Sequence, residues 1–249
     1  MNLGLEGKVA AVSGASTGLG KATAYALARE GALVVLSSRD NARAKAAAHE
    51  ISAKTGRRAL YDAVDVRKPN AWIERIVRKT GRLDILVNNA GGPPEGAASE
   101  IDDLDWRKGF ELNFLAFARL SRQAAVPMKK GGWGRIVFIA STSAKQPIAG
   151  LAVSNAMRAA ILGLSKTLSQ ELGPRNILVN TVCPGYTNTD RLKELVPKGK
   201  MAALAQSQPV RRIAEPHEIA DVVAFLCSER ASYVTGTALC VDGGRTAGI

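Results

Sequence analysis

Apolar residues follow two different periods along this chain. Short runs rich in Val, Ile, Leu and Ala alternate with longer stretches in which apolar positions recur every three or four residues. Runs of the first kind predict buried β-strands, and stretches of the second kind predict amphipathic helices. The predicted strands are Lys8–Ser13, Ala32–Ser37, Ala59–Val64, Leu83–Val87, Gly134–Ala140, Ile177–Thr181 and Ala238–Val241.

Helices are predicted in the intervals between these strands. They cover Leu19–Glu30, Ala42–Lys54, Ala71–Lys79, Leu104–Met128, Ser154–Leu172 and Glu218–Ser228. Left-handed glycine caps are expected at Gly31, Gly56, Gly81 and Gly173. No linker or internal repeat divides the chain, so residues 1–249 are expected to form a single α/β domain. The predicted architecture is a doubly wound Rossmann fold, a seven-stranded parallel sheet flanked by helices on both faces.

The composition is that of an ordinary globular protein with an unusual charge. Hydrophobic residues make up 46% of the 249 residues, and the formal net charge is +12. That charge suits a phosphorylated cofactor or an acidic carrier protein, but a solvated basic surface explains it equally. The basic residues form no arm and are not interleaved with aromatic residues, which argues against nucleic-acid binding. No stretch has the apolar length of a membrane span, and the first residues lack a signal-peptide pattern, so a cytoplasmic protein is expected.

Metal ligands are scarce in this sequence. The three cysteines, Cys183, Cys227 and Cys240, are widely spaced, and the only histidines are His49 and His217. Neither set has the spacing of a metal site or a redox pair. We therefore expect no metal site, and we expect the cysteines to act as small buried apolar residues.

A glycine-rich segment follows the first predicted strand and opens the first helix. It reads Ser13-Gly14-Ala-Ser-Thr-Gly18-Leu-Gly20. Glycines here allow a tight turn and a close approach of the backbone to a pyrophosphate at the helix N-terminus. The spacing is not the G-x-G-x-x-G fingerprint, and a plain strand-to-helix turn is the alternative. Its position in the first β–α unit favours a dinucleotide site formed by Gly14, Ser16, Thr17, Gly18, Leu19 and Gly20.

The end of the second predicted strand bears on the choice of cofactor. An acidic residue at this point binds the adenosine ribose hydroxyls and repels a 2′-phosphate. This chain has Ser38 followed by Arg39, whose guanidinium fork suits a phosphate. NADP(H) is therefore favoured over NAD(H), with an ordinary exposed arginine as the alternative reading of Arg39.

Further motifs occur in a characteristic order. After the glycine-rich segment come Asp65-Val66, Asn88-Asn89-Ala90-Gly91, Asn113, Ser141, Pro184-Gly185 and Val241-Asp242-Gly243-Gly244. On these motifs the chain resembles the short-chain dehydrogenase/reductase family from Lys8 to Gly244, and within it the 3-oxoacyl-(acyl carrier protein) reductases. The resemblance implies that adenine meets Asp65 and Val66, that the adenosine ribose lies beside Asn89, Ala90 and Gly91, and that the nicotinamide carboxamide is held by Pro184, Gly185, Thr187 and Thr189.

The resemblance also implies a catalytic group with two departures. Ser141 matches the serine that polarises the substrate carbonyl, and Asn113 matches the asparagine that holds a relay water. The expected Tyr-x-x-x-Lys is replaced by Ser154-Asn-Ala-Met-Arg158. Residues at i and i+4 share a helix face, so Ser154 and Arg158 should still point together toward the cofactor.

The two departures have different chemical consequences. Arg158 can still bind ribose hydroxyls, but it keeps its charge and cannot relay a proton. Ser154 is shorter and far less acidic than tyrosine, and general acid catalysis typically contributes about 10²–10⁴-fold. Tyr186, Lys145 or a water in the space of the missing ring are the candidate proton donors, although ordinary structural roles for both residues stay open.

Two functions remain open on this sequence. One is an NADP(H)-dependent oxidoreductase that reduces a carbonyl, with a 3-oxoacyl thioester among its candidate substrates, to an alcohol. The other is a catalytically impaired NADP-binding pseudoenzyme that acts as a cofactor sensor or an oligomer subunit. Lys129, Lys130 and Arg175 occupy regions that can meet an acidic acyl carrier protein in the reductases that the chain resembles. The apolar circumference of the two longest helices predicts a homo-oligomer, either a dimer or a tetramer.

Overall fold

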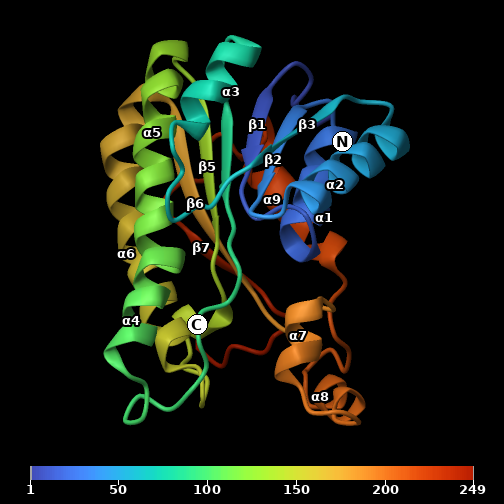
Figure 1. Cartoon of the computed structure of the whole chain (residues 1–249), viewed down its shortest axis with the longest axis vertical. Helices are drawn as coiled ribbons and strands as arrows, with labels where there is room; N and C mark the ends of the chain where they lie inside the picture. Colours follow the sequence, from blue (N-terminus) through green and yellow to red (C-terminus); the bar gives the residue numbers. More distant parts are fainter. Residues whose placement is uncertain (1, 249) are drawn as a thin grey trace.

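One parallel sheet organises the molecule, and the computed structural model describes residues 2–248. The sheet has seven strands in the order β3-β2-β1-β4-β5-β6-β7 (Figure 1). All neighbouring pairs run parallel, so the predicted sheet is confirmed. The strands are β1 (Val9–Val12), β2 (Leu33–Ser38), β3 (Ala59–Ala63), β4 (Ile85–Asn88), β5 (Gly134–Ile139), β6 (Ile177–Pro184) and β7 (Ala238–Val241).

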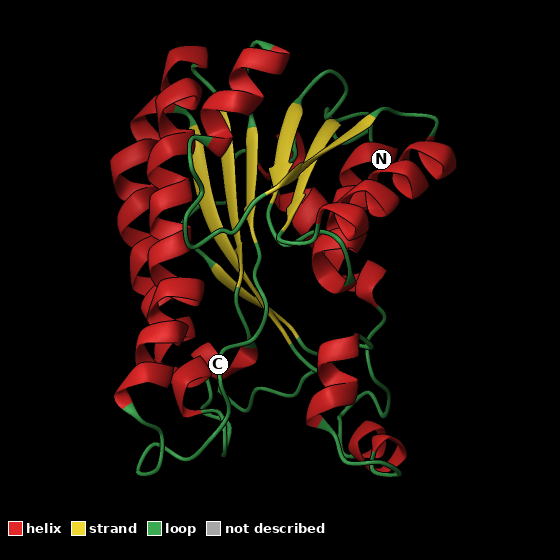
Figure 2. Ribbon diagram, viewed as in Figure 1, coloured by secondary structure: helices red, strands yellow, loops and turns green. Residues whose placement is uncertain are grey.

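Helices cover both faces of this sheet (Figure 2). They are α1 (Gly18–Arg29), α2 (Asn41–Thr55), α3 (Trp72–Thr80), α4 (Asp103–Phe110), α5 (Ala116–Gly131), α6 (Ala152–Leu172), α7 (Asp190–Leu195), α8 (Met201–Gln206) and α9 (Pro216–Leu226). Between residues 2 and 248, no helix has both the length and the apolar character required to cross a bilayer. The short helices α7 and α8 project beside the carboxyl ends of the strands (Figure 1).

Two hydrophobic cores lie on opposite faces of the sheet. Successive side chains of a strand point to opposite faces, and all four residues of β1 are buried. Ala10 and Val12 pack with α1, α2 and α9, whereas Val9 and Ala11 pack with α3, α5 and α6. This double burial explains why the strands appear in the sequence as unbroken apolar runs. The doubly wound Rossmann fold expected from the sequence is therefore confirmed.

Two of the three cysteines follow the expectation for small buried apolar residues, whereas Cys240 is only half-buried. All three are free, and Cys183 and Cys227 are buried in the two cores. Burial raises the pKa of the Cys227 thiol to about 12, so this thiol stays protonated at neutral pH.

The long helix predicted over Leu104–Met128 is interrupted. A π-helical turn at Glu111–Leu115 separates α4 from α5. Such a turn inserts one extra residue into the helical spiral, and π-turns are frequent at functional sites. Here the turn carries Asn113, whose side chain is completely buried. The prediction of one continuous helix was wrong because the apolar periodicity is almost the same in both geometries.

Three of the four predicted glycine caps are confirmed. Gly31, Gly56 and Gly81 have positive φ angles after α1, α2 and α3. The prediction for Gly173 was wrong, because its φ of −52° is right-handed. The chain instead continues into a 3₁₀ turn over Gly173–Arg175, and Asn176 takes the left-handed position with φ of 58°. Asparagine tolerates this conformation better than most side chains.

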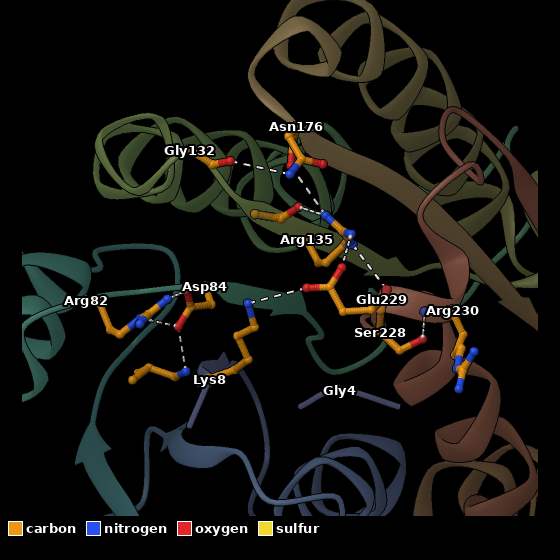
Figure 3. A network of polar contacts seen from close by, with 12 residues as sticks. Gly4, Lys8, Arg82, Asp84, Gly132, Arg135, Asn176, Ser228, Glu229 and Arg230 are labelled. Carbon is orange, nitrogen blue, oxygen red and sulfur yellow. Dashed lines mark hydrogen bonds and ion pairs between the residues drawn. The ribbon is translucent and has the colours of Figure 1, made fainter. Parts of the chain in front are cut away.

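A buried arginine braces the amino-terminal edge of the sheet (Figure 3). Arg135 on β5 is 1% exposed, donates to the Gly134 carbonyl at 2.8 Å and stacks on Trp133 at 4.2 Å. Burial lowers the pKa of this guanidinium, and the carboxylate of Glu229, 3.8 Å away, opposes that shift. Glu229 also approaches Lys8 within 3.6 Å. This network ties the segment before β1 to β5 and to the turn after α9, at the end of the sheet opposite to the strands' carboxyl ends.

Candidate active site

A cavity of about 770 Å³ opens at the carboxyl ends of the strands. It is lined by residues that follow β1, β2, β3, β4 and β5. Strands β2 and β3 lie on one side of β1, and β4 to β7 lie on its other side, so the strand order changes direction between β1 and β4. Doubly wound folds bind ligands at such a switch point. Most of the predicted site residues meet here: Gly14, Ser16, Thr17, Gly18, Leu19, Ser38, Arg39, Val66, Asn89, Ala90, Gly91, Ser141, Ser154, Arg158 and Thr189.

Six predicted site residues do not line this cavity. They are Gly20, Asp65, Asn113, Pro184, Gly185 and Thr187. Gly20 lies in α1 behind the glycine turn, and Gly185 packs so closely on Asp242 that an added Cβ would lie 2.7 Å from the Asp242 Cα.

The glycine turn between β1 and α1 presents backbone to the cavity. Gly14 has a φ of 56°, and an added Cβ would lie 2.8 Å from the carbonyl oxygen of Asn89. The Asn89 side chain donates to the Gly14 carbonyl at 2.9 Å, so the ends of β1 and β4 are locked together. Asn89 thus braces the glycine turn while it lines the cavity.

The N-terminus of α1 is open to an anion. Thr17 is the N-cap residue, but its side chain makes no capping hydrogen bond, and the first turn contains no acidic residue. The first amides of a helix lack intrahelical partners, and the helix dipole makes this end partially positive. Together with the glycine turn, this end of the 12-residue helix provides donors suited to a diphosphate.

The end of β2 carries no free carboxylate. Ser38 accepts from the Ser16 hydroxyl at 3.1 Å, and Arg39 is exposed at the rim of the cavity. Asp40 is the nearest acid in the sequence, but it caps α2 by accepting from the amide of Arg43 at 3.0 Å. Arg39 forms no ion pair with any residue between 2 and 248, so its guanidinium is available to a ligand.

Asp65 is engaged by a neighbouring cation. Its carboxylate lies 2.6 Å from Arg67, and the hydrogen bonds from that guanidinium lower the pKa of Asp65. Val66, the next residue, lines the cavity, whereas Asp65 does not. That both residues meet adenine stays a prediction.

Three serine hydroxyls cluster where β5 meets α6. Ser141 caps a 3₁₀ turn over Thr142–Ala144 by accepting from the amide of Ser143 at 3.1 Å. The Ser143 hydroxyl lies 3.2 Å from the hydroxyl of Ser154 in the first turn of α6. Ser143 was missed from the sequence, although its position two residues after Ser141 was a signal that could have found it.

Arg158 lies one helical turn after Ser154 and is 6% exposed. Its Nη1 donates to the carbonyl of Ile139 at 2.8 Å, and its Nε has no partner among residues 2–248. Burial lowers the pKa of this guanidinium to about 10, which leaves it charged at neutral pH. Ser154 and Arg158 line the same cavity, and that they point together toward a bound cofactor stays a prediction.

Asn113 supports the cavity from the π-helical turn. Its amide nitrogen donates to the carbonyl of Gly91 at 2.9 Å, and Gly91 lines the cavity. Its Oδ1 is buried and has no partner among the described residues. Asn113 therefore lies behind the cavity surface, with a buried acceptor oxygen that no described residue satisfies.

The proposed substitutes for a tyrosine lie elsewhere. Among residues 2–248, neither Tyr186 nor Lys145 lines the cavity. The ring of Tyr186 lies under the guanidinium of Arg245 at 4.2 Å, and Lys145 is exposed.

Arg191 lines the cavity, although no sequence motif pointed to it. It projects from α7, donates to the carbonyl of Pro93 at 3.3 Å and pairs with Glu95 at 2.9 Å. These contacts tie α7 to the segment after β4 across one wall of the cavity. The residues around Arg191 show no recognition motif, which is why this bridge could not be predicted.

This fold, with its glycine turn, open helix N-terminus and hydroxyl cluster in one cavity, defines a dinucleotide-binding oxidoreductase. The family described as enoyl-(acyl carrier protein) reductase matches residues 14–246. The chain belongs to the short-chain dehydrogenase/reductase family.

Named relatives extend over almost the whole chain. It is 36% identical to the 3-oxoacyl-[acyl-carrier-protein] reductase of Aquifex aeolicus (strain VF5), covering 98% of this chain and 99% of that protein. It is also 36% identical to the 7alpha-hydroxysteroid dehydrogenase of Escherichia coli (strain K12), covering 98% and 96%. The crystal structure of L-sorbose reductase from Gluconobacter frateurii, complexed with NADPH and L-sorbose, matches with a TM-score of 0.95 and 38% identity over 100% of both chains.

Proposed function

We propose that this protein is an NADP(H)-dependent reductase that converts a carbonyl to an alcohol with a non-standard catalytic group. One observation carries the proposal: Ser141, Ser154 and Arg158 line the same cavity as the glycine turn. The hydroxyl donors and the positive charge of Arg158 thus share a cavity with the backbone amides that would bind the dinucleotide.

The cavity fits the cofactor at its diphosphate. The uncapped amides of α1 would hold the diphosphate, and the absence of a Cβ at Gly14 lets the backbone approach it. Ala90 and Gly91 would border the adenosine ribose, and Arg158 would donate to the ribose hydroxyls nearest to nicotinamide. When bound, the nicotinamide supplies the hydride of the reaction.

NADP(H) is proposed over NAD(H) because of the end of β2. Arg39 forms no ion pair within residues 2–248, and the residue before it is the neutral Ser38. The carboxylate of Asp40 is committed to the cap of α2 rather than to a ribose. The NADPH complex of the L-sorbose reductase supports the same choice.

The chain's own groups divide the remaining work. Ser141 would donate a hydrogen bond to the substrate carbonyl, and the charge of Arg158 would stabilise negative charge that develops on that oxygen. Ser154 is a neutral donor whose hydroxyl is shared with Ser143. Because a serine hydroxyl is a weak acid, we propose that water delivers the final proton at this end of the cavity.

The substrate and the assembly belong to the same proposal. Reductases of 3-oxoacyl-[acyl-carrier-protein] are among the relatives, and Lys129, Lys130 and Arg175 are exposed cations that an acidic carrier could meet.

We also propose a homo-oligomer, because α5 exposes Val126 at 69% and α6 exposes Ala156, Ala160 and Gly163. Sedimentation of a monomer at micromolar concentration would contradict that assembly.

Calorimetric titration with NADPH, followed by a panel of ketones and 3-oxoacyl thioesters, tests this function. We expect saturable NADPH binding and NADPH oxidation with at least one member of the panel. The matched comparison is the double variant Ser154→Tyr/Arg158→Lys, which introduces the residues that the family resemblance predicts at these positions. If the wild type binds NADPH but stays silent while the double variant turns over, the protein is a pseudoenzyme. Absence of NADPH binding overturns both functions.

A further inference from the structure

Two free cysteines lie opposite each other on neighbouring strands. Strands β6 and β7 run side by side at one edge of the sheet (Figure 1), and Cys183 and Cys240 are paired residues of their parallel ladder. Both side chains belong to the core that packs against α3, α5 and α6. The two cysteines are far apart in the sequence, so only the folded chain brings them together.

The spacing of these two positions suits a disulfide. Neighbouring strands lie about 4.7–4.9 Å apart, and the Cα atoms of a disulfide are usually about 4.4–6.8 Å apart. Paired Cβ atoms of parallel strands keep roughly the strand spacing, whereas those of a disulfide lie about 3.5–4.5 Å apart. The strands therefore have to draw together slightly when the bond forms. A bond under such strain is easily reduced again, which is typical of regulatory disulfides rather than structural ones.

The two thiols differ in accessibility. Cys240 is half-buried on the edge strand β7, whereas Cys183 is completely buried. Burial and the neighbouring Cys240 raise the pKa of the Cys183 thiol to about 12, so Cys183 stays a neutral thiol at neutral pH. An oxidant therefore meets Cys240 first, and Cys183 is in place to react with the oxidised residue.

We propose that Cys240 is a site of oxidation by hydroperoxides and that Cys183 converts the oxidised residue to a reversible disulfide. In the first step the sulfur of Cys240 attacks the O–O bond of hydrogen peroxide, which gives a sulfenic acid and one water. In the second step the sulfur of Cys183 attacks the sulfur of Cys240, and the S–O bond breaks. The hydroxyl leaves with the Cys183 proton as a second water. The two thiols together lose two electrons and two protons, and the peroxide is reduced to two waters.

The strand ends that follow the two cysteines are packed without slack. Gly185 comes two residues after Cys183, and its amide donates to the carbonyl of Val241 at 3.0 Å. A Cβ on Gly185 would lie only 2.7 Å from the Cα of Asp242. A movement of β6 toward β7 must therefore displace the segment that begins at Gly185.

That segment leads into the wall of the cavity. The Thr187 hydroxyl donates to the carbonyl of Gly185 at 3.2 Å, and the Thr189 hydroxyl donates to the carbonyl of Thr187 at 3.3 Å. Thr189 lines the cavity. We therefore expect the disulfide to weaken NADPH binding. This consequence rests on the proposed function, whereas formation of the disulfide does not.

Tryptic digestion without reductant, followed by mass spectrometry, detects the bond directly. Cleavage after arginine and lysine places Cys183 in the peptide 176–191, Cys240 in the peptide 231–245 and Cys227 in the peptide 213–230. After treatment with hydrogen peroxide, we expect the first two peptides to be joined and lighter by two hydrogens. Dithiothreitol should separate them again. Absence of this joined pair from the oxidised wild type overturns the inference, whatever the variants do.

Single variants assign the two roles. In Cys183→Ala, oxidation should stop at the sulfenic acid of Cys240, which dimedone traps as an adduct. In Cys240→Ala, neither an adduct nor a disulfide should form at Cys183. Cys227→Ala is the matched control, because Cys227 is equally buried but lies in the core on the other face of the sheet, and it should form the wild-type disulfide. A dimedone adduct on Cys183 in Cys240→Ala overturns the assigned order. If Cys183→Ala does not fold, Cys183→Ser replaces it.

Titration with NADPH, after removal of the peroxide, tests the link to the cavity. The oxidised wild type should bind NADPH at least about 10-fold more weakly than the reduced protein, because small displacements of a binding wall are costly. Dithiothreitol should restore the affinity, and peroxide-treated Cys240→Ala should bind like the reduced wild type. Equal affinities of the oxidised and reduced wild type overturn the link to the cavity. Failure of the reduced protein to bind NADPH overturns the proposed function, but it does not affect the disulfide seen in the digest.

Discussion

The hydroxyl groups of Ser143 and Ser154 lie 3.2 Å apart and join the turn after β5 to the first turn of α6. Ser143 is 2% exposed and Ser154 is 9% exposed, so the contact is shielded from water. The contact orients the one hydroxyl that stands where the family resemblance predicts a tyrosine. The pair thus belongs both to the packing of α6 and to the chemistry of the cavity.

A double-mutant cycle on this pair should show coupling. Ser143→Ala and Ser154→Ala each leave the other hydroxyl buried without its partner, and each should lower the free energy of unfolding by about 1–2 kcal/mol. The double variant removes both hydroxyls together and should cost less than the sum of the two single changes. Urea denaturation monitored by circular dichroism measures all four proteins. Strict additivity would show that the 3.2 Å contact contributes nothing to stability.

Gly20, in α1 behind the glycine turn, should not tolerate a side chain. A Cβ there would clash with the carbonyl oxygen of Gly14 and lie 2.7 Å from the side-chain nitrogen of Asn89. Gly20→Ala should therefore lower the free energy of unfolding by about 1–3 kcal/mol, as overpacking does. NADPH affinity should fall as well, because the displaced turn carries the diphosphate donors.

Gly131→Ala is the matched control for this change. Gly131 is the last residue of α5, and a Cβ there would meet no atom within 4 Å. Its stability should stay within about 0.5 kcal/mol of the wild type, with unchanged NADPH affinity. Equal behaviour of the two variants in denaturation and in NADPH titration would refute the steric argument.

Acid should weaken the start of α9 in a defined pH window. Glu218 accepts hydrogen bonds from Arg212, which lower the pKa of its carboxyl to about 2, well below its usual value of 4.5. The ionised form is therefore favoured in the folded state. Its stabilisation is complete above about pH 4.5 and is lost as the pH falls toward about 2.

Glu218→Gln tests this expectation. The variant should be less stable than the wild type at pH 6, and the gap should narrow progressively below pH 4.5. Thermal denaturation at several pH values measures the gap. Glu171→Gln is the control, because Glu171 is exposed and forms no ion pair between residues 2 and 248. A gap that stays constant down to pH 2 would exclude the assigned cause.

The fold could be predicted because its physical causes are local. Buried parallel strands show as unbroken apolar runs, and all seven were found within a few residues of their observed bounds. The glycine turn could also be placed, since its position after β1 decides its role. The π-helical turn at Glu111–Leu115 could not, because its apolar pattern also suits an α-helix.

The candidate site was harder to predict from sequence, because its properties depend on contacts between residues that are far apart in the chain. Helical spacing predicted that Ser154 and Arg158 share a face, but not that Arg158 is buried without an acid beside it. That fact depends on which groups the fold brings to Arg158, where the carbonyl of Ile139 supplies the one hydrogen-bond partner. The same limit explains why Ser143 was overlooked: its partner lies on another element.

Cofactor preference should reside largely in Arg39. Arg39→Met removes the guanidinium that has no acidic partner at the end of β2. Charge-assisted hydrogen bonds to a phosphate contribute enough that NADPH affinity should fall about 10- to 100-fold. NADH lacks the 2′-phosphate, so its affinity should change little. Titration of both cofactors into wild type and variant measures the ratio of NADPH affinity to NADH affinity.

The matched control is Arg57→Met. Arg57 is an exposed arginine that does not line the cavity, and it pairs with Glu6 at 2.7 Å. If Arg39→Met weakens NADPH and NADH equally, the arginine does not read the 2′-phosphate, and the preference for NADP(H) loses its structural basis.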